Sequence, residues 1–443
     1  MDSGGRRVRA GQVLVILALA ALVLWYLGRF ADRHGFFDLK VYYGAVRYWA
    51  GGHGEIYDFL KAGTKYGFTY PPFAMLTMLP MAVLPWPVVF TTSWIASVAV
   101  TLVLIYWLLG PAVRGQGWPM WFALTVAMIL AAGFEPLHET ISFGQVNMFL
   151  VIVVVADFVL LVKPGHRWAG LGVGLATAVK LTPGIFIVYL LLARRFRAAA
   201  VAGVTFATAT VFAMAVAPDA SREYWTEAVW DTDRVGQLSY ISNQSWEGLV
   251  ARLNPGHPNT LLWAVLVLAT LAVWVWRARR AGRAGDLLGG VALTGVAGSL
   301  VSPITWVHHL VWLLPALLLL VAQGLGARGR RRVALLAFAT ALYALLCSEV
   351  VWHFADHFRG WGLVGSNAYV FASAALLVGL PLARRGAVPG VPDGEAVPDL
   401  GELDRVGARP VNGESGVRVG RGVDGEAVPL VEPAGPKVGF EHP

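Results

Sequence analysis

The sequence contains little charge and almost no cysteine. Only 14% of its 443 residues are Asp, Glu, Lys or Arg, against roughly 25% in soluble proteins. The single cysteine, Cys347, excludes an intramolecular disulfide and a zinc site built from cysteines, and its apolar surroundings predict a packing role. These two shortages argue against a soluble or disulfide-stabilised domain.

Apolar runs make up most of the chain, which is 57% hydrophobic. Many are roughly 17 to 23 residues long, enough to cross a hydrocarbon core of about 30 Å. The sequence therefore predicts an all-α integral membrane protein. The predicted spans are 11–29, 86–109, 118–133, 146–162, 168–193, 197–217, 259–276, 286–301, 309–323, 331–349 and 366–383, and the shorter run 72–85 is predicted to be short or re-entrant.

The run 168–193 differs from the others because Lys180 and Pro183 stand at its middle. A lysine at the centre of a bilayer is costly unless it reaches water or a partner. We therefore expect two short helices that meet at this point, an arrangement tolerated where a broken helix lines a cavity.

Arginine clusters flank the apolar runs and account for much of the net charge of +8. Their placement is typical of topology signals and excludes a nucleic-acid surface, so we predict that they are cytoplasmic. The clusters are 194–197, 277–283, 328–332 and 384–385. With an uncleaved first span and both termini cytoplasmic, about twelve crossings then place 31–72 and 218–258 outside.

A second topology satisfies the same signals. In it, 168–193 is one span and 72–85 crosses the membrane, which puts Gln145 inside. We favour the first because it collects nearly all the polar candidates on one face.

The end of the chain, 386–443, has a different composition. It is rich in Gly, Pro, Val, Asp and Glu and repeats DGEAVP at 393–398 and 424–429. Such a composition cannot bury enough apolar area to offset the entropy of ordering. The sequence predicts a transmembrane domain over 1–385 and a disordered cytoplasmic tail over 386–443.

The polar stretch 31–72 carries Asp38, the sharpest candidate for chemistry, within FFDLKVYYGA. Flanking aromatic residues can desolvate the carboxylate, raise its pKa and suit it to accept a proton from a hydroxyl nucleophile. Capping of a surface helix, or pairing with Lys40 or Arg47, explains the residue equally well. Glu55 and Asp58 are secondary candidates for which a solvated or structural role is favoured.

Three polar residues within or beside apolar runs are further candidates. Lys180 requires water or an anionic partner, and that partner is either a lipid-linked phosphate or an acid such as Glu135 or Asp38. Gln145 and Asn147 can bind sugar hydroxyls through paired donors and acceptors, or can cap and link helices, and the structural role is favoured.

The stretch 218–258 contains Arg222, Arg234 and the cluster Asn243, Gln244 and Trp246. The amides and the indole suit carbohydrate, and Trp246 equally suits an interfacial anchor. A glycosylation sequon begins at Asn243, although such three-residue matches are common.

Histidines occur at two places. His308 and His309 are adjacent, so on a helix they point about 100° apart and do not ligate one metal together. One of the two histidines can donate a hydrogen bond to a phosphate, or it can simply pack at the membrane interface. The sequence supports both interpretations equally. For the pattern His353, Asp356 and His357, a solvated loop is favoured over a metal site.

Taken together, these residues resemble the polyprenol-phosphate-sugar-dependent glycosyltransferases of the GT-C superfamily, and within it glycosyltransferase family 87. The resemblance rests, in chain order, on FFDLKVYYGAVRYW, GGHGEIYD, FTYPPFAMLTMLP, EPLHETISFGQVNMFLVIVVVAD, GLATAVKLTPGIFIVYLLLARRFRAA, SNQSWEGLVARL and SPITWVHHLVWLLP. It implies a GT-C-type helical bundle that transfers a sugar, most often mannose and in some members arabinofuranose, from a polyprenyl-phosphate donor. It further implies an inverting reaction on the extracytoplasmic side that uses no metal or other cofactor.

In that family an aspartate of the first outer loop is the general base, and Asp38 falls where it is expected. The departing phosphate needs positive or hydrogen-bonding groups; the candidates are Lys180, His308, His309, Arg222 and Arg234. The candidates for sugar or acceptor binding are Tyr70, Gln145, Asn147, Asn243, Gln244 and Trp246. The expected acceptor is an extracytoplasmic lipid or glycan; a transporter or flippase for lipid-linked sugars is the alternative, since broken helices suit that role also.

Overall fold

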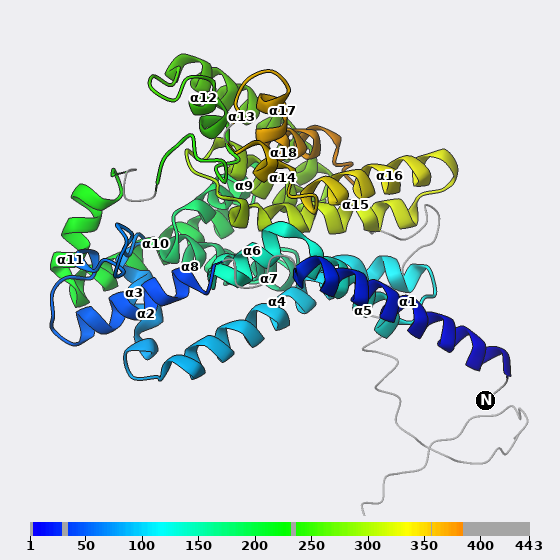
Figure 1. Cartoon of the computed structure of the whole chain (residues 1–443), viewed down its shortest axis with the longest axis horizontal. Helices are drawn as coiled ribbons and strands as arrows, with labels where there is room; N and C mark the ends of the chain where they lie inside the picture. The colour runs from blue at the N-terminus through cyan, green and yellow to red at the C-terminus, as the bar shows by residue number, and fades with distance from the viewer. Residues whose placement is uncertain (1–2, 29–33, 232–235, 356, 384–443) are drawn as a thin grey trace, which may run out of the picture. The chain divides into compact units, whose positions relative to one another are not determined.

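The computed structural model describes residues 3–28, 34–231, 236–355 and 357–383, and within these ranges the chain is helical (Figure 1). Among them a single isolated bridge, Leu60 to Gly67, is the only β contact. The all-α prediction is confirmed. The predicted tail 386–443 lies outside the described residues, as do Arg234 and Asp356.

The helices follow one another closely along the chain. The α-helices are α1 (Ser3–Gly28), α2 (Phe37–Ala50), α3 (Pro72–Met78), α4 (Trp86–Gly115), α5 (Met120–Gly133), α6 (Glu135–Phe143), α7 (Asn147–Ala156), α8 (Leu171–Val179), α9 (Ile185–Leu192), α10 (Phe196–Val216), α11 (Pro218–Glu223), α12 (Trp246–Leu253), α13 (Thr260–Ala284), α14 (Leu287–Val301), α15 (Leu314–Gly326), α16 (Gly329–Leu346), α17 (Trp361–Ser366) and α18 (Ala368–Gly379). The 3₁₀ and π segments are η1 (Ile56–Asp58), η2 (Leu79–Ala82), η3 (Asp157–Val162), η4 (Thr182–Gly184), η5 (Tyr224–Ala228), η7 (Val307–Leu313) and η8 (Val350–Phe354).

In the described part of the chain, five helices are long and apolar enough to cross a membrane. They are Arg7–Gly28 of α1, α4, α10, α13 and the continuous Val307–Gly326, which joins η7 to α15. Helices α5 and α6 meet at a bend of 72° and count as a sixth if they form one span. The predicted number of about twelve is not confirmed, because five further apolar helices have only 10–17 residues and α16, although 18 residues long, is not among the candidate spans.

The long helices differ in how much of their apolar surface other helices cover. Only 6% of the apolar window of α1 and 22% of that of α10 and α13 is buried inside the protein, against 78% for Val307–Gly326. Water disfavours such large exposed apolar faces, whereas lipid accepts them. The chain is therefore a multi-pass membrane protein with Val307–Gly326 at its centre.

The run 168–193 is interrupted at Lys180 and Pro183, where the sequence predicted a break. Helix α8 ends at Val179, Lys180 is extended (φ −150°, ψ 131°), and Pro183 lies in η4 before α9 begins. Because the backbone leaves the helix at Lys180, its side chain is free to turn away from the helix axis.

Close packing against α10 fixes the position of α8. Gly170 precedes α8 with φ +100°, and a Cβ there would lie 1.9 Å from the carbonyl oxygen of Ala198 in α10. Asp157 accepts the backbone N–H groups of Gly170 and Val173, both at 2.9 Å, and so caps the start of α8. The position of Lys180 thus depends on the α8–α10 contact.

The stretch 31–72 is expected as a loop, and its described part, 34–72, is partly helical and folds against α3 and α11. Helix α2 buries Tyr42 and Val46 in a small apolar core, in which Tyr57 stacks on Tyr224 with ring centroids 5.8 Å apart. This core holds the first turn of α2, and with it Asp38, beside the ends of α6 and α7.

Candidate active site

Asp38 lies in the first turn of α2, where the partial positive charge of a helix N-terminus stabilises a carboxylate. The residue before the helix, Phe36, is held in the left-handed region (φ 57°), and its N–H donates to the carbonyl of Ser142 in α6 at 2.8 Å. This backbone bond fixes the start of α2 against α6.

One oxygen of Asp38 is bonded and the other is not. Gln145 Nε2 donates to Oδ2 at 2.6 Å, whereas no described residue forms a hydrogen bond with Oδ1. Burial raises the pKa of Asp38 to about 6, against the lowering effects of the Gln145 bond and of the charges of Lys180 and His34. A carboxylate with a raised pKa and a free oxygen has the properties of a general base.

Buried tyrosine hydroxyls connect Asp38 to Lys180. The Tyr70 hydroxyl donates to Gln145 Oε1 at 2.8 Å, and since that uses its only proton, Tyr42 Oη is the donor in the 2.9 Å contact between the two tyrosines. Lys180 Nζ donates to Tyr70 Oη at 3.4 Å. Residues from α2, α8 and the segments before α3 and α7 thus meet in one network.

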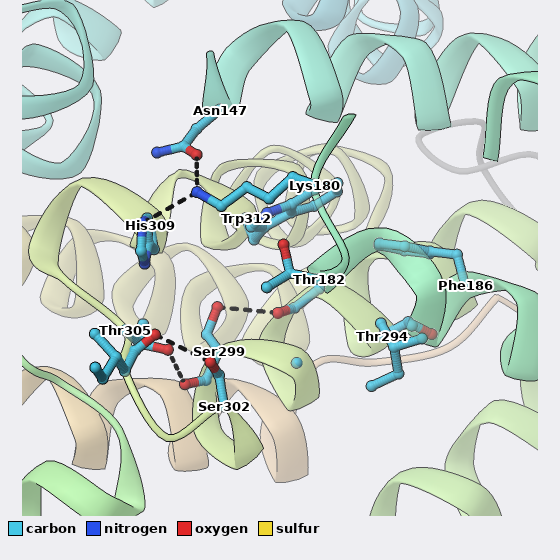
Figure 2. A pocket seen from close by; sticks show the side chains of 14 residues that line it. Asn147, Lys180, Thr182, Phe186, Thr294, Ser299, Ser302, Thr305, His309 and Trp312 are labelled. Carbon is cyan, nitrogen blue, oxygen red and sulfur yellow. Dashed lines mark hydrogen bonds between the residues drawn. The ribbon is translucent and has the colours of Figure 1, made fainter. Parts of the chain in front are cut away.

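Lys180 extends toward Asn147 and His309, as Figure 2 shows. Its Nζ lies 3.0 Å from Asn147 Oδ1 and 3.2 Å from His309 Nε2. The backbone N–H of Trp306 lies 3.2 Å from His309 Nδ1. The ammonium group of Lys180 can only donate, so the tautomer of His309 decides whether Nε2 accepts from Lys180 or Nδ1 accepts from Trp306. Lys180 thus directs its donors at the side chains of Tyr70, Asn147 and His309, and an anionic oxygen that replaces one of these contacts can accept from the ammonium group.

His308 points elsewhere. Its carbonyl accepts from Thr140 Oγ1 at 2.7 Å and from Asn147 Nδ2 at 3.1 Å, which fastens η7 to α6 and α7. Its ring packs against Phe143, and its buried Nε2 has no hydrogen-bond partner in the described ranges.

Two cavities adjoin Lys180. The first is polar, about 30 Å³, and has the hydroxyls of Ser299, Ser302 and Thr305 across from Lys180 and His309 (Figure 2). It has room for a few water molecules but not for a sugar. The second is apolar, about 500 Å³, and lies between α3, α4, α7 and α8.

The apolar cavity begins beside the polar network. Its lining includes Leu39, Gly144, Val146 and Val179, which are chain neighbours of Asp38, Gln145, Asn147 and Lys180, and continues along Met78, Val89, Phe149 and Leu175. Its position and its lining suit a hydrocarbon chain whose polar end reaches the network.

The structure brings together six of the predicted site residues and leaves five described ones apart, one of which is His308. Those brought together are Asp38, Tyr70, Gln145, Asn147, Lys180 and His309. Arg222 is exposed on α11 and makes no contact with this network. Arg234, also predicted, lies outside the described residues.

The other three candidates join parts of the fold. Asn243 is fully buried and bonds to Leu238 O and Pro303 O through Nδ2, and to the N–H of Thr305 through Oδ1. Gln244 Nε2 donates to the carbonyls of Ile241 and Ser366, and Trp246 Nε1 donates to Thr270 in α13. These contacts favour the structural interpretation of the cluster and place the sequon at Asn243 out of reach of modification in the folded chain.

The secondary candidates also have local roles. Asp58 is exposed, and its carboxylate accepts the N–H of Glu55 at 3.0 Å in a capping box of η1. His353 Nδ1 lies 3.2 Å from the carbonyl of Glu349. No group of three or more His, Cys, Asp or Glu side chains suited to a metal ion occurs in the described ranges.

Sequence reasoning missed two contributors to the site. Tyr42 follows Asp38 by four positions and therefore shares its helix face, a spacing that reveals it once the stretch is treated as helical. His34 and Glu139 form a pair at 2.9 Å, with His34 stacked on Phe143. They are 105 positions apart, so no local signal connects them.

A partly buried carboxylate and a lysine at a broken helix, both near an apolar cavity, are features that suit a membrane enzyme acting on lipid-linked substrates. The profile named Glycosyltransferase family 87 matches residues 68–303. A polyprenol-phosphate-mannose-dependent alpha-(1-2)-phosphatidylinositol mannoside mannosyltransferase of Mycolicibacterium smegmatis is 35% identical over 398 residues, which cover 83% of this chain and 89% of the relative. The chain belongs to glycosyltransferase family 87, and it is a glycosyltransferase.

Other relatives show comparable similarity. The Mycobacterium tuberculosis protein of the same name is 33% identical, over 84% of this chain and 91% of its own. A polyprenol-phosphate-mannose-dependent alpha-(1-2)-phosphatidylinositol pentamannoside mannosyltransferase of M. smegmatis is also 33% identical, over 87% and 95%. No solved structure matches the chain.

Proposed function

We propose that this protein transfers mannose from a polyprenyl-phosphate donor to a lipid-linked mannoside by an inverting reaction with Asp38 as general base. The observation that carries the proposal is the geometry of Asp38, whose Oδ2 is held by Gln145 while Oδ1 has no partner among the described residues. Family membership and the donors named for the relatives support the choice of mannose.

In the proposed step, Oδ1 of Asp38 removes the proton of an acceptor hydroxyl as its oxygen attacks the anomeric carbon of the mannose. The new C–O bond forms on the face opposite the bond to phosphate, which breaks with its electron pair leaving on the phosphate oxygen. This displacement inverts the anomeric carbon. Holding both reactants at one site supplies the orientation that the reaction requires.

Lys180 and His309 are the proposed binding groups for the departing phosphate. Lys180 Nζ and His309 Nε2 are 3.2 Å apart, and an anionic oxygen bound beside them can accept from the ammonium group and, in the tautomer with the proton on Nε2, from His309 as well. Asn147 orients Lys180 through the 3.0 Å bond to its Oδ1. Groups fixed in advance where charge develops stabilise a transition state.

The apolar cavity of about 500 Å³ is the proposed site of the donor's prenyl chain. Its lining includes Val179, the chain neighbour of Lys180, so a prenyl chain in the cavity can place the attached phosphate near the ammonium group. The exposed apolar faces of the neighbouring α4 and α10 provide a route from the lipid.

The proposed acceptor is a phosphatidylinositol mannoside, as in the names of the relatives. The number of mannose residues it carries depends on the shape of the acceptor side of the site, because specificity follows from contacts made in the transition state.

We further propose that the shorter apolar helices cross the membrane together with the long ones, which gives about twelve crossings with an extracytoplasmic site. The direct bond between Asp38 and Gln145 supports this topology over the alternative that puts Gln145 inside. Residues 1–385 form the proposed transferase domain; a chain ending at Arg385 that lost transfer would contradict this division.

The test is transfer of radiolabelled mannose from polyprenyl-phosphate-mannose to endogenous lipids in membranes that contain the Asp38→Asn variant. Loss of a general base predicts a rate lower by about 10²–10⁴-fold. Asp58→Asn is the matched control, since it makes the same change at an exposed aspartate of the same stretch. We expect it to retain activity.

Three outcomes are informative when both variants are monodisperse and melt as the wild type does. Undiminished transfer by Asp38→Asn contradicts the assignment of the base. Equal losses in both variants indicate a structural role for the stretch. Transfer from an arabinofuranose donor, with none from mannose, replaces the proposed sugar.

A further inference from the structure

A second polar cavity lies away from the catalytic network, where the turn between α9 and α10 meets the end of α13. It has a volume of about 380 Å³ and is lined by Arg194, Arg279 and Arg283 together with Leu191 and Phe196. Gly282 packs directly on Ala193, where an added Cβ would lie 2.7 Å from the Ala193 Cα, so the two chain segments are held at a fixed separation.

The three guanidinium groups at this cavity have no protein partner. None forms a hydrogen bond or ion pair with a residue in the described ranges, and all three residues are exposed. No acidic side chain lines the cavity. The nearby Asp286 uses its carboxylate on the backbone N–H groups of Gly289 (2.9 Å) and Ala383 (2.8 Å).

Neighbouring arginines differ in this respect. Arg277 donates to the carbonyls of Leu377 and Leu380, and Arg280 packs over the ring of Trp276 at 5.0 Å. The cavity therefore brings together three arginines whose donors no described residue uses. A planar guanidinium group can form two parallel hydrogen bonds with two oxygens of one phosphate.

The position of the cavity identifies the kind of phosphate. Candidate span α10 begins at Phe196 and candidate span α13 ends at Ala284, so both spans reach the membrane surface here. Leu191 and Phe196 are 46% and 62% exposed beside the arginines. A ligand that binds both the arginines and the apolar side chains carries a phosphate attached to hydrocarbon chains.

We propose that this cavity, formed by Arg194, Arg279 and Arg283, binds the phosphodiester headgroup of an anionic glycerophospholipid whose acyl chains lie along Leu191 and Phe196. Basic cavities at the ends of membrane helices have the chemistry for such lipids. The site lies apart from the residues assigned to mannosyl transfer, and the proposal does not depend on that function.

The experiment measures retention of phosphatidylglycerol by the full-length protein. The protein is reconstituted in phosphatidylcholine nanodiscs with increasing phosphatidylglycerol, and lipid that stays bound is counted by native mass spectrometry. For the wild type we expect saturable retention. The Arg279→Gln/Arg283→Gln double variant should need at least about tenfold more phosphatidylglycerol for the same occupancy.

Arg330→Gln/Arg331→Gln is the matched control, because it removes the same charge from the start of α16. We expect it to bind as the wild type does. Equal weakening in the two double variants would mean that only net charge attracts the lipid, and would overturn the proposal.

Glycerol phosphate serves as the soluble competitor. Displacement of the lipid at comparable concentrations would show that the cavity takes a free phosphate, which also overturns the proposal. Arg279→Lys/Arg283→Lys should restore part of the affinity, since lysine retains the charge without the planar pair of donors.

Discussion

At the scale of single residues, the proposed role of Asp38 as general base predicts how activity depends on pH. Its pKa is raised to about 6 because burial disfavours the charged carboxylate more than Gln145, Lys180 and His34 favour it. A general base must be deprotonated, so activity is lost as pH falls through this pKa. We predict that kcat/KM for mannosyl transfer rises with pH and that the midpoint of this rise lies at about pH 6. The measurement is of initial rates from pH 4.5 to 8. A rate that stays constant over this range would exclude Asp38 as the titrating base.

The amide of Gln145 connects that pKa to the rest of the site. Its 2.6 Å bond to Oδ2 stabilises the charged form of Asp38 and so lowers the pKa. In Gln145→Leu we expect the midpoint of the pH profile to move upward and the rate at pH 7 to fall, with partial recovery at higher pH. Gln323→Leu, which removes a glutamine bonded to the Pro381 carbonyl, is the control and should leave the midpoint unchanged. A reduced rate with an unshifted midpoint would mean that Gln145 only supports the local structure.

Several of these residues were predictable from the sequence alone. Asp38 stands among aromatic residues in a polar stretch, and Lys180 stands with a proline inside an apolar run, so each is conspicuous without a structure. The contact of Asp38 with Gln145 was not predictable, because 107 positions separate them. It depends on how α2 packs against α6 and α7, which no local pattern encodes.

At the scale of helices, the packing of α8 against α10 determines where Lys180 lies. A Cβ on Gly174 in α8 would lie 2.5 Å from the carbonyl oxygen of Ala202 in α10. Gly174→Val therefore forces the helices apart, for which overpacked sites suggest a loss of about 1–3 kcal/mol. We predict a lower melting temperature in detergent together with reduced transfer.

Gly203→Val is the matched control for this prediction. It makes the same substitution inside α10, at a position where an added Cβ meets no atom within 4 Å. Its melting temperature should stay close to that of the wild type. Similar losses in the two variants would indicate a general intolerance of valine in these helices, and the α8–α10 contact would then not explain the result.

Helix boundaries were harder to predict than the presence of helices. The expected spans 86–109 and 259–276 continue as α4 to Gly115 and as α13 to Ala284, because a helix extends into polar residues once it has begun. The two stretches expected as outer loops contain α2, α11 and α12, which are short and stabilised by packing against the bundle. Their apolar residues are too few for hydropathy to reveal them.

At the scale of the whole molecule, the site constrains the proposed path of the chain through the membrane. Asp38, Gln145, Lys180 and His309 meet at one site. The chain must therefore come back to the same face of the membrane at each of these four positions. Two topologies agree with the arginine clusters, and they place the turn after α4 on opposite sides of the membrane. In the twelve-crossing topology Gln116 lies inside, whereas in the alternative it lies outside.

Single cysteines in a Cys347→Ser background distinguish the two topologies. We predict that Lys65→Cys and His257→Cys react with a membrane-impermeant maleimide in intact cells, because both residues are exposed in the segments assigned to the outer face. Gln116→Cys and Arg330→Cys should react only after permeabilisation. Labelling of Gln116→Cys in intact cells would select the alternative, in which 72–85 crosses the membrane. Because Gln145 bonds to Asp38 of the outer stretch, we expect the first result.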